Sequence, residues 1–216
     1  MDYYVQHFST VELNNSFYRQ PTAASWNRWQ DTAPAGFCFA VKASRFLTHI
    51  KRLKDPANSL KRVVDGADQL TPHLGPLLYQ LPPTFKRTEE NVARLDSFMA
   101  LLPHRTDHAI EFRDASWFGD ETLKQLREHH VAFCVHDMDH EHECPVVATS
   151  GIAYVRFHGP AAKKYQGEYT SRQLKLWAQK LHAIAHDTDA IWAFFNNDNH
   201  GYAVSNANQL KELIES

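Results

Sequence analysis

The chain has 216 residues, of which 43% are hydrophobic and 22% are charged, and its formal net charge is −2. This length suffices for one sizeable core, so the sequence predicts a single domain over residues 1–216. The composition is that of an ordinary globular protein. The sequence contains no apolar run long enough to cross a bilayer. Because the net charge is slightly negative, the chain has no overall positive field that would attract nucleic acid or an anionic membrane.

Short segments rich in Val, Ile, Phe and Tyr recur along the chain, as is typical of β-strands. They are residues 9–14, 36–43, 74–82, 108–113, 131–137, 152–159 and 190–198. Each is nearly continuous in hydrophobicity, which favours parallel strands that are buried on both faces.

Between these segments, apolar residues recur with the spacing of an α-helix. The predicted helices are residues 22–31, 57–70, 88–102, 120–130, 170–186 and 206–215. Thr88, Asp120 and either Thr170 or Ser171 are the expected N-caps of three of them. Strands and helices thus alternate, which is typical of an α/β fold with a parallel sheet.

The strand ends decide between an open sheet and a (β/α) barrel. The chain has only 8 glycines and lacks both GxGxxG and GxxxxGK[ST], which disfavours an open nucleotide-binding sheet. Every predicted strand stops in polar residues, and in a barrel those ends converge on one mouth. These residues are Glu12, Asn14, Lys42, Gln80, Glu111, Arg113, His136, Asp137, Arg156, His158, Asn196, Asn197 and Asp198.

The polar strand ends point to chemistry on an anionic ligand. Glu111 and Glu12 are candidate acid/base groups. Cations from three strands, Lys42, Arg113 and Arg156, suit a phosphorylated or sugar-like anion. Trp117 could stack on a sugar or a base. We expect catalytic roles for Glu111, Glu12, Lys42 and His158, and ligand-binding roles for Asn14, His49, Gln80, Arg113, Trp117, Arg156, Asn196 and Asn197.

The first hypothesis is therefore a metal-independent hydrolase or lyase with a small anionic ligand as partner and no cofactor. A second is a metal-dependent phosphoesterase or nuclease of the endonuclease IV type. HDMDHEHEC at 136–144 offers weak candidate ligands in His136, Asp137 and His140, although the spacing matches no zinc motif. A third is a binding barrel without catalysis, for an anionic ligand or nucleic acid. The same residues could also form only an ion-pair lattice.

The cysteines and the first residues bear on the compartment. Three cysteines without a CxxC motif argue against a disulfide framework. MDYYVQHF has neither the basic nor the apolar region of a signal peptide. We expect a reduced, cytoplasmic protein with no membrane partner, and the sequence assigns no oligomeric state.

Six segments in order resemble one known family. VELNNSFYRQP, FCFAVKASRFLTH, LGPLLYQLPPTF, AIEFRDASW, AYVRFHG and WAFFNND are similar to the family called domain of unknown function 72, or YecE-like. The resemblance covers essentially the whole chain. It implies a TIM-like barrel with its pocket at the strand ends, and no particular reaction.

Members of that family usually begin with a first strand resembling GTSGW and then a helix. MDYYVQHF is similar to the end of that helix. We therefore expect an α/β fold, a TIM-like (β/α) barrel with seven recognisable strands that lacks the first βα unit.

Overall fold

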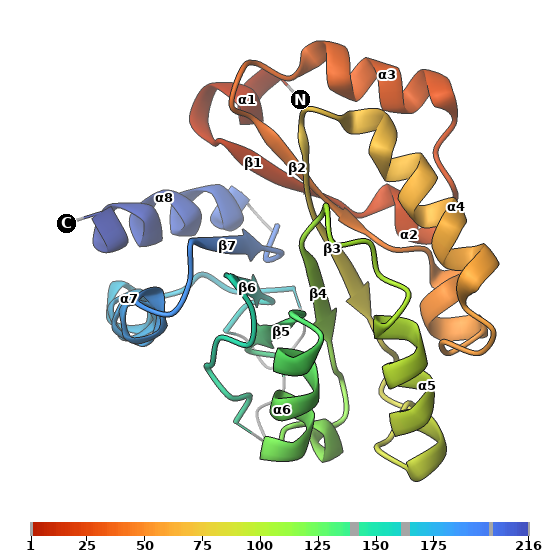
Figure 1. Cartoon of the computed structure of the whole chain (residues 1–216). Helices are drawn as coiled ribbons and strands as arrows, with labels where there is room; N and C mark the ends of the chain where they lie inside the picture. Colours follow the sequence, from red (N-terminus) through yellow and green to blue (C-terminus); the bar gives the residue numbers. More distant parts are fainter. Residues whose placement is uncertain (1, 139–142, 161–164, 199–200, 216) are drawn as a thin grey trace. The chain divides into compact units, whose positions relative to one another are not determined.

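The structure is a computed structural model that describes residues 2–138, 143–160, 165–198 and 201–215. It contains two compact units, unit 1 over residues 1–117 and unit 2 over residues 118–216, and each is described by itself (Figure 1). All seven predicted strands are present among the described residues, each inside its expected range.

Unit 1 contains four parallel strands in the order in which they follow one another in the chain. They are β1 (Thr10–Leu13), β2 (Cys38–Lys42), β3 (Leu74–Gln80) and β4 (His108–Glu111). Three registers connect them, with Glu12 opposite Ala40, Lys42 opposite Leu78 and Gln80 opposite Glu111.

The helices of unit 1 precede, connect or follow these strands. They are α1 (Asp2–His7), α2 (Asn15–Tyr18), α3 (Ala23–Thr32), the π-helix η1 (Phe46–Ile50), α4 (Ala57–Ala67), the 3₁₀ helices η2 (Asp68–Leu70) and η3 (Ala115–Trp117), and α5 (Glu89–Met99). Figure 1 shows α3, α4 and α5 along one side of the strands. Tyr79 of β3 packs edge-on against Phe98 of α5, with ring centroids 4.9 Å apart, which identifies the face of β3 that the helices cover.

Unit 2 contains the parallel strands β5 (Ala132–His136), β6 (Ile152–Phe157) and β7 (Ala190–Phe195), with helices α6 (Asp120–Glu128), α7 (Ser171–Ala185) and α8 (Tyr202–Glu215). His136 lies opposite Arg156, and Arg156 lies opposite Phe194. Phe157 of β6 contacts Trp177 of α7 edge-on at 5.0 Å, so the neighbours Arg156 and His158 point away from α7.

The predicted N-caps are confirmed at two helices and wrong at one. The hydroxyls of Thr88 and Thr170 accept hydrogen bonds from the backbone N–H groups of Asn91 and Gln173, both at 3.3 Å. The cap of α6 is Gly119, and Asp120 is the first helical residue. A carboxylate in the first turn is favourable there because the helix dipole is positive at that end.

Two short helices at the strand ends of unit 1 were not predicted. α2 follows β1 directly and η1 follows β2. Both helices lie in segments whose apolar residues do not recur with helical spacing. Among the residues that the structure describes, no helix is both long enough and apolar enough to cross a membrane.

Candidate functional site

Four polar side chains share one face of the sheet in unit 1. In a parallel pair, residues in register point to the same face, and so do residues two apart in one strand. Glu12 is in register with Ala40, two residues before Lys42, and Lys42 is in register with Leu78, two residues before Gln80. Gln80 is in register with Glu111. Glu12, Lys42, Gln80 and Glu111 therefore form one row, on the face opposite Tyr79 and the helices.

Glu111 and Arg113 form an ion pair at the end of this row. Nε of Arg113 contacts the Glu111 carboxylate, whose side chain is fully buried, while the Arg113 side chain is 9% exposed. A buried pair of this kind requires close geometry, because removing two charges from water costs several kcal/mol. The guanidinium therefore fixes the position of the carboxylate.

Phe17 of α2 connects Lys42 to His49. The Lys42 Nζ lies 4.3 Å from the centre of the Phe17 ring, a cation–π contact. The His49 ring meets the same phenyl ring edge-on, with centroids 5.0 Å apart. The end of β2, α2 and η1 thus meet around one aromatic side chain.

His49 is neutral at pH 7. Burial, together with the positive charges of Lys42, Arg45 and Arg113, lowers the pKa of His49 to about 4, while Glu111 acts in the opposite direction. Its Nδ1 lies 2.9 Å from the hydroxyl of Thr48, which also donates to the Ser44 carbonyl at 3.2 Å. Three cations and one carboxylate therefore act on this imidazole.

In unit 2, His136, Arg156 and His158 lie on one face of the sheet. His136 and Arg156 are in register, and His158 follows Arg156 by two residues. All three side chains are buried, and the two histidine rings have centroids 6.3 Å apart. The backbone N–H of Met138 lies 3.4 Å from His136 Nδ1.

Asp137 anchors the loop that precedes α7. Its Oδ1 accepts a hydrogen bond from the backbone N–H of His158 at 2.7 Å, and its Oδ2 accepts one from the Tyr169 hydroxyl. The same hydroxyl accepts from the Gly159 N–H at 2.7 Å. Burial and the neighbouring Asp137 charge raise the pKa of Tyr169. Both Asp137 oxygens are engaged, which indicates a structural role.

The two asparagines after β7 have different surroundings. Nδ2 of Asn197 donates to the Gly167 carbonyl at 2.9 Å and to Oδ1 of Asn206 in α8 at 3.0 Å. Nδ2 of Asn196 is buried and has no hydrogen-bond partner among the described residues. Since an unsatisfied buried donor costs about 1–3 kcal/mol, Asn196 is suited to donate to a ligand. The amide nitrogen of Asn197 stabilises the fold, while its Oδ1 is also buried without a hydrogen-bond partner among the described residues.

Comparison with known proteins identifies the family to which the chain belongs. The family model "Protein of unknown function DUF72" matches residues 1–216. The chain belongs to the DUF72 family. It is 28% identical to the UPF0759 protein YunF of Bacillus subtilis over 244 aligned positions, which cover 98% of this chain and 85% of the relative. With the UPF0759 protein YecE of Escherichia coli it shares 26% identity over 119 positions, 55% of this chain and 43% of the relative.

Solved DUF72 structures confirm the fold class. A family protein from Thermotoga maritima superimposes with a TM-score of 0.86 and 30% identity, covering 97% of this chain and 85% of that one. One from Enterococcus faecalis matches with a TM-score of 0.81 at 20% identity, covering 99% and 87%. The predicted TIM-like α/β barrel with seven strands is therefore confirmed.

One predicted ligand-binding residue of this DUF72 chain needs correction. Trp117 is fully buried, its ring stacks on both Phe85 and Phe112, and its Nε1 donates to the Phe85 carbonyl at 2.7 Å. Its faces are therefore covered, and Trp117 is a core residue and not a surface on which a ligand stacks. Asn14, also expected to bind, is half-buried at the start of α2, where its carbonyl accepts from the Phe17 N–H at 3.2 Å.

The sequence analysis did not single out three residues that surround His49. Phe17, Thr48 and Arg45 all lie outside the predicted strands and helices. The one usable signal was charge, because Arg45 belongs to a stretch from residue 32 to residue 54 without Asp or Glu.

A metal site at His136, Asp137 and His140 stays a prediction. Among the described residues there is no group of three or more His, Cys, Asp or Glu side chains placed to hold a metal ion. His140, one of the weak candidates, lies outside the described residues.

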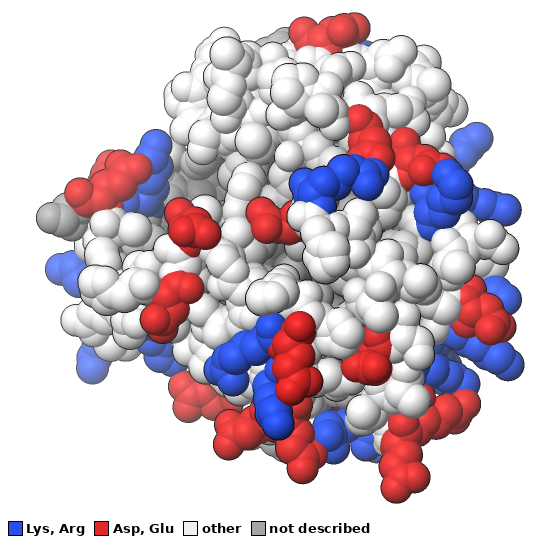
Figure 2. Space-filling model, in the orientation of Figure 1, with Lys and Arg blue, Asp and Glu red and all other residues white. Residues whose placement is uncertain are grey.

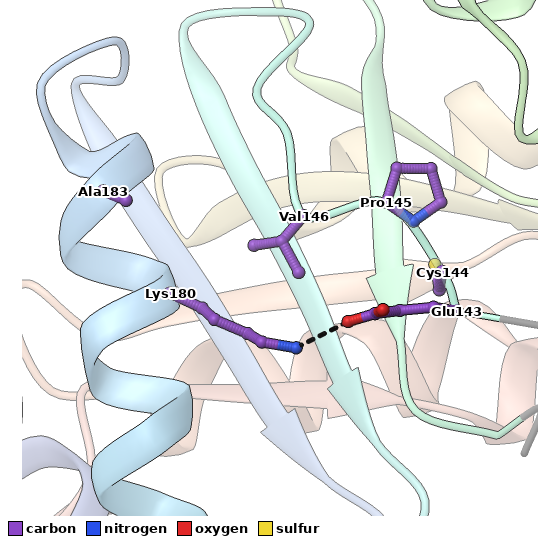
Figure 3. Close-up of a pocket in the computed structure, with 6 residues that line it drawn as sticks. All are labelled: Glu143, Cys144, Pro145, Val146, Lys180 and Ala183. Carbon is purple, nitrogen blue, oxygen red and sulfur yellow. Dashed lines mark hydrogen bonds and ion pairs between the residues drawn. The ribbon is translucent and has the colours of Figure 1, made fainter.

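Unit 2 also has a shallow surface pocket of about 380 Å³, lined by Glu143, Cys144, Pro145, Val146, Lys180 and Ala183. Figure 3 shows Lys180 extending from α7 toward Glu143, with which it pairs at 3.0 Å. None of the predicted site residues lines this pocket.

Proposed function

We propose that the chain is a hydrolase or lyase that acts on a small anionic ligand, phosphorylated or sugar-like, and that Glu111 exchanges a proton with it. The observation that supports this most is geometric: the register places Lys42 and Glu111 on one face of the sheet, and Arg113 pairs with Glu111 at the end of that row. The charges of Lys42, Arg45 and Arg113 also lower the pKa of the nearby His49. Cations from several elements around one small volume suit phosphate or carboxylate groups.

The residues divide into charge-binding and proton-transferring groups. Arg113 has the planar fork that matches an anion, and Lys42 is a compact charge steadied over Phe17. Glu111, as a carboxylate oriented by Arg113, can accept a proton from the ligand or from water. Gln80 lies beside Glu111 in the row and offers an amide to the same ligand.

The binding half of the proposal is tested with inorganic phosphate, by calorimetry and by thermal shift. We expect Lys42→Met and Arg45→Gln each to weaken phosphate binding about tenfold, because each removes one cation. Lys61→Met is the matched control, since Lys61 is exposed and paired with Asp65 on α4. Equal affinity in all four proteins would overturn the binding site.

The catalytic half is tested with nitrophenyl phosphate esters and nitrophenyl glycosides, with and without a chelator. Loss of a general acid or base lowers turnover by about 10²–10⁴-fold. We expect that loss in Glu111→Gln with phosphate binding retained, and no loss in Glu89→Gln, at an exposed position of α5. Phosphate binding without turnover would identify a binding protein, and loss of turnover with chelator would identify the metal-dependent alternative.

A further inference from the structure

A strongly basic segment passes through unit 1. Residues 32–54 contain no Asp or Glu, and they include Lys42, Arg45, Lys51, Arg52 and Lys54. Unit 1 carries 14 Lys and Arg against 12 Asp and Glu, whereas unit 2 carries 9 against 13. The net charge of −2 therefore conceals a local excess of positive charge in and around η1.

Large apolar side chains are exposed in the same place. Tyr18 of α2 is 80% exposed, and Phe46 and Ile50 of η1 are 46% and 63% exposed. Phe17 contacts Tyr18 and His49 edge-on, both at 5.0 Å, which places α2 beside η1. The basic-aromatic surface is defined here as Tyr18, Arg45, Phe46, Ile50, Lys51 and Arg52.

One cation of this surface, Arg52, lies in a turn with an unusual backbone conformation. Arg52, Leu53 and Asp55 have φ values of 48°, 60° and 45°, the left-handed region that non-glycine residues rarely adopt. Leu53 is buried, and its N–H donates to the Leu47 carbonyl at 3.2 Å. Such backbone strain persists only where packing over-determines it, and it concentrates at ligand clamps and functional sites.

Cations and rings are also interleaved on this surface. The Lys51 Nζ lies 5.9 Å from the centre of the Phe46 ring, within cation–π range. Figure 2 shows acidic and basic side chains intermingled over the face of the molecule that it draws. An excess of cations beside exposed aromatic rings is the combination that single-stranded nucleic acid requires, with phosphates on the cations and bases on the rings.

We propose that the basic-aromatic surface binds single-stranded nucleic acid without sequence preference. A lipid surface fits less well, because η1 has only five residues and offers no long amphipathic helix. The surface shares Arg45 with the proposed phosphate site, but the variants used below leave Arg45, Lys42 and the Glu111–Arg113 pair unaltered, so their outcome does not depend on the proposed reaction.

The test measures fluorescence anisotropy of fluorescein-labelled dT15 with the full chain over a series of salt concentrations. We expect Lys51→Gln/Arg52→Gln to weaken binding at least tenfold at low salt. We also expect it to reduce the slope of log K against log salt by about 1.4, the value for two lost phosphate contacts on a single strand. Tyr18→Ala/Phe46→Ala should weaken binding at least fivefold without changing the slope, because stacking releases no counterions.

Lys124→Gln/Lys211→Gln is the control, since both lysines are exposed in unit 2 and each faces a glutamate four residues on. It should bind dT15 like the unaltered chain. The proposal is overturned if the unaltered chain does not bind dT15 or if both surface variants bind it equally well. It is overturned as well if the aromatic variant loses nothing, which would mean attraction to any polyanion. Preferential binding to phosphatidylserine vesicles would assign the surface to a lipid instead.

Discussion

Glu111 and Arg113, two residues apart in the chain, form an ion pair in which the carboxylate is completely buried. Glu111 is the last residue of β4, and Arg113 lies just past the strand, so the pair lies at the end of the row formed by Glu12, Lys42, Gln80 and Glu111. Its charges influence His49, which belongs to η1 after β2. Two strand ends that are far apart in the sequence are thus coupled electrostatically.

Removing Arg113 should destabilise the chain. Breaking a buried ion pair typically costs about 3–5 kcal/mol, because one charge stays buried without its counter-ion. We expect Arg113→Met to lower the free energy of unfolding by about 3 kcal/mol in urea titrations. Adding Glu111→Gln should restore part of this loss, because the buried charge is then gone as well.

The matched control is Arg94→Met, which breaks the pair with the exposed Glu90 on α5. A surface pair contributes at most about 1 kcal/mol, so the control should cost much less. Equal costs for Arg113→Met and Arg94→Met would show that burial of the Glu111–Arg113 pair is unimportant for stability.

His108 should make unit 1 sensitive to acid. Its Nδ1 lies 3.2 Å from the Tyr79 hydroxyl and its Nε2 lies 3.0 Å from the Pro103 carbonyl. Burial is the main cause that lowers the pKa of His108 to about 4, with the charges of His104 and Arg105 acting in the same direction. The Pro103 hydrogen bond acts against this lowering. The unfolded chain, with an ordinary histidine, therefore binds more protons between about pH 6.5 and pH 4.

The stabilisation from neutral His108 is complete above about pH 6.5 and is lost as the pH falls toward 4. It amounts to about 3 kcal/mol, because lowering a pKa by one corresponds to about 1.4 kcal/mol. Urea titrations at pH 7.5, 5.5 and 4 should show the unaltered chain losing more stability than His108→Gln. Parallel pH profiles for the two proteins would rule out His108 as the cause.

Trp117→Phe separates a core role from a ligand role. Phenylalanine can keep the stacking on Phe85 and Phe112 but loses the hydrogen bond to the Phe85 carbonyl. We expect a loss of about 1–3 kcal/mol in stability, the cost of leaving a buried acceptor unpaired. Affinities for inorganic phosphate and for AMP should not change. A selective loss of AMP affinity would instead restore the stacking role that the sequence suggested.

The strands and most helices could be predicted because their apolar spacing is a local property. The grouping of Glu12, Lys42, Gln80 and Glu111 could also be predicted, because the carboxyl ends of parallel strands lie at the same edge of a sheet. The role of Trp117 could not be predicted, because Phe85 covers it from 32 positions away. Asn196 and Asn197 differ by one position, and the sequence does not reveal which of them faces α8. Arg45 and Phe17 depend on η1 and α2, which have no periodic signal.

The polar row of unit 1 has a consequence for folding fidelity. Sliding one strand of a sheet by a single residue turns all its side chains to the opposite face. For β2 this would move Lys42 to the face where Tyr79 meets α5, and for β4 it would do the same to Glu111. A charge placed there would cost several kcal/mol, whereas an apolar strand could slip cheaply. The side chains proposed to hold the ligand therefore also favour a single register of strand pairing.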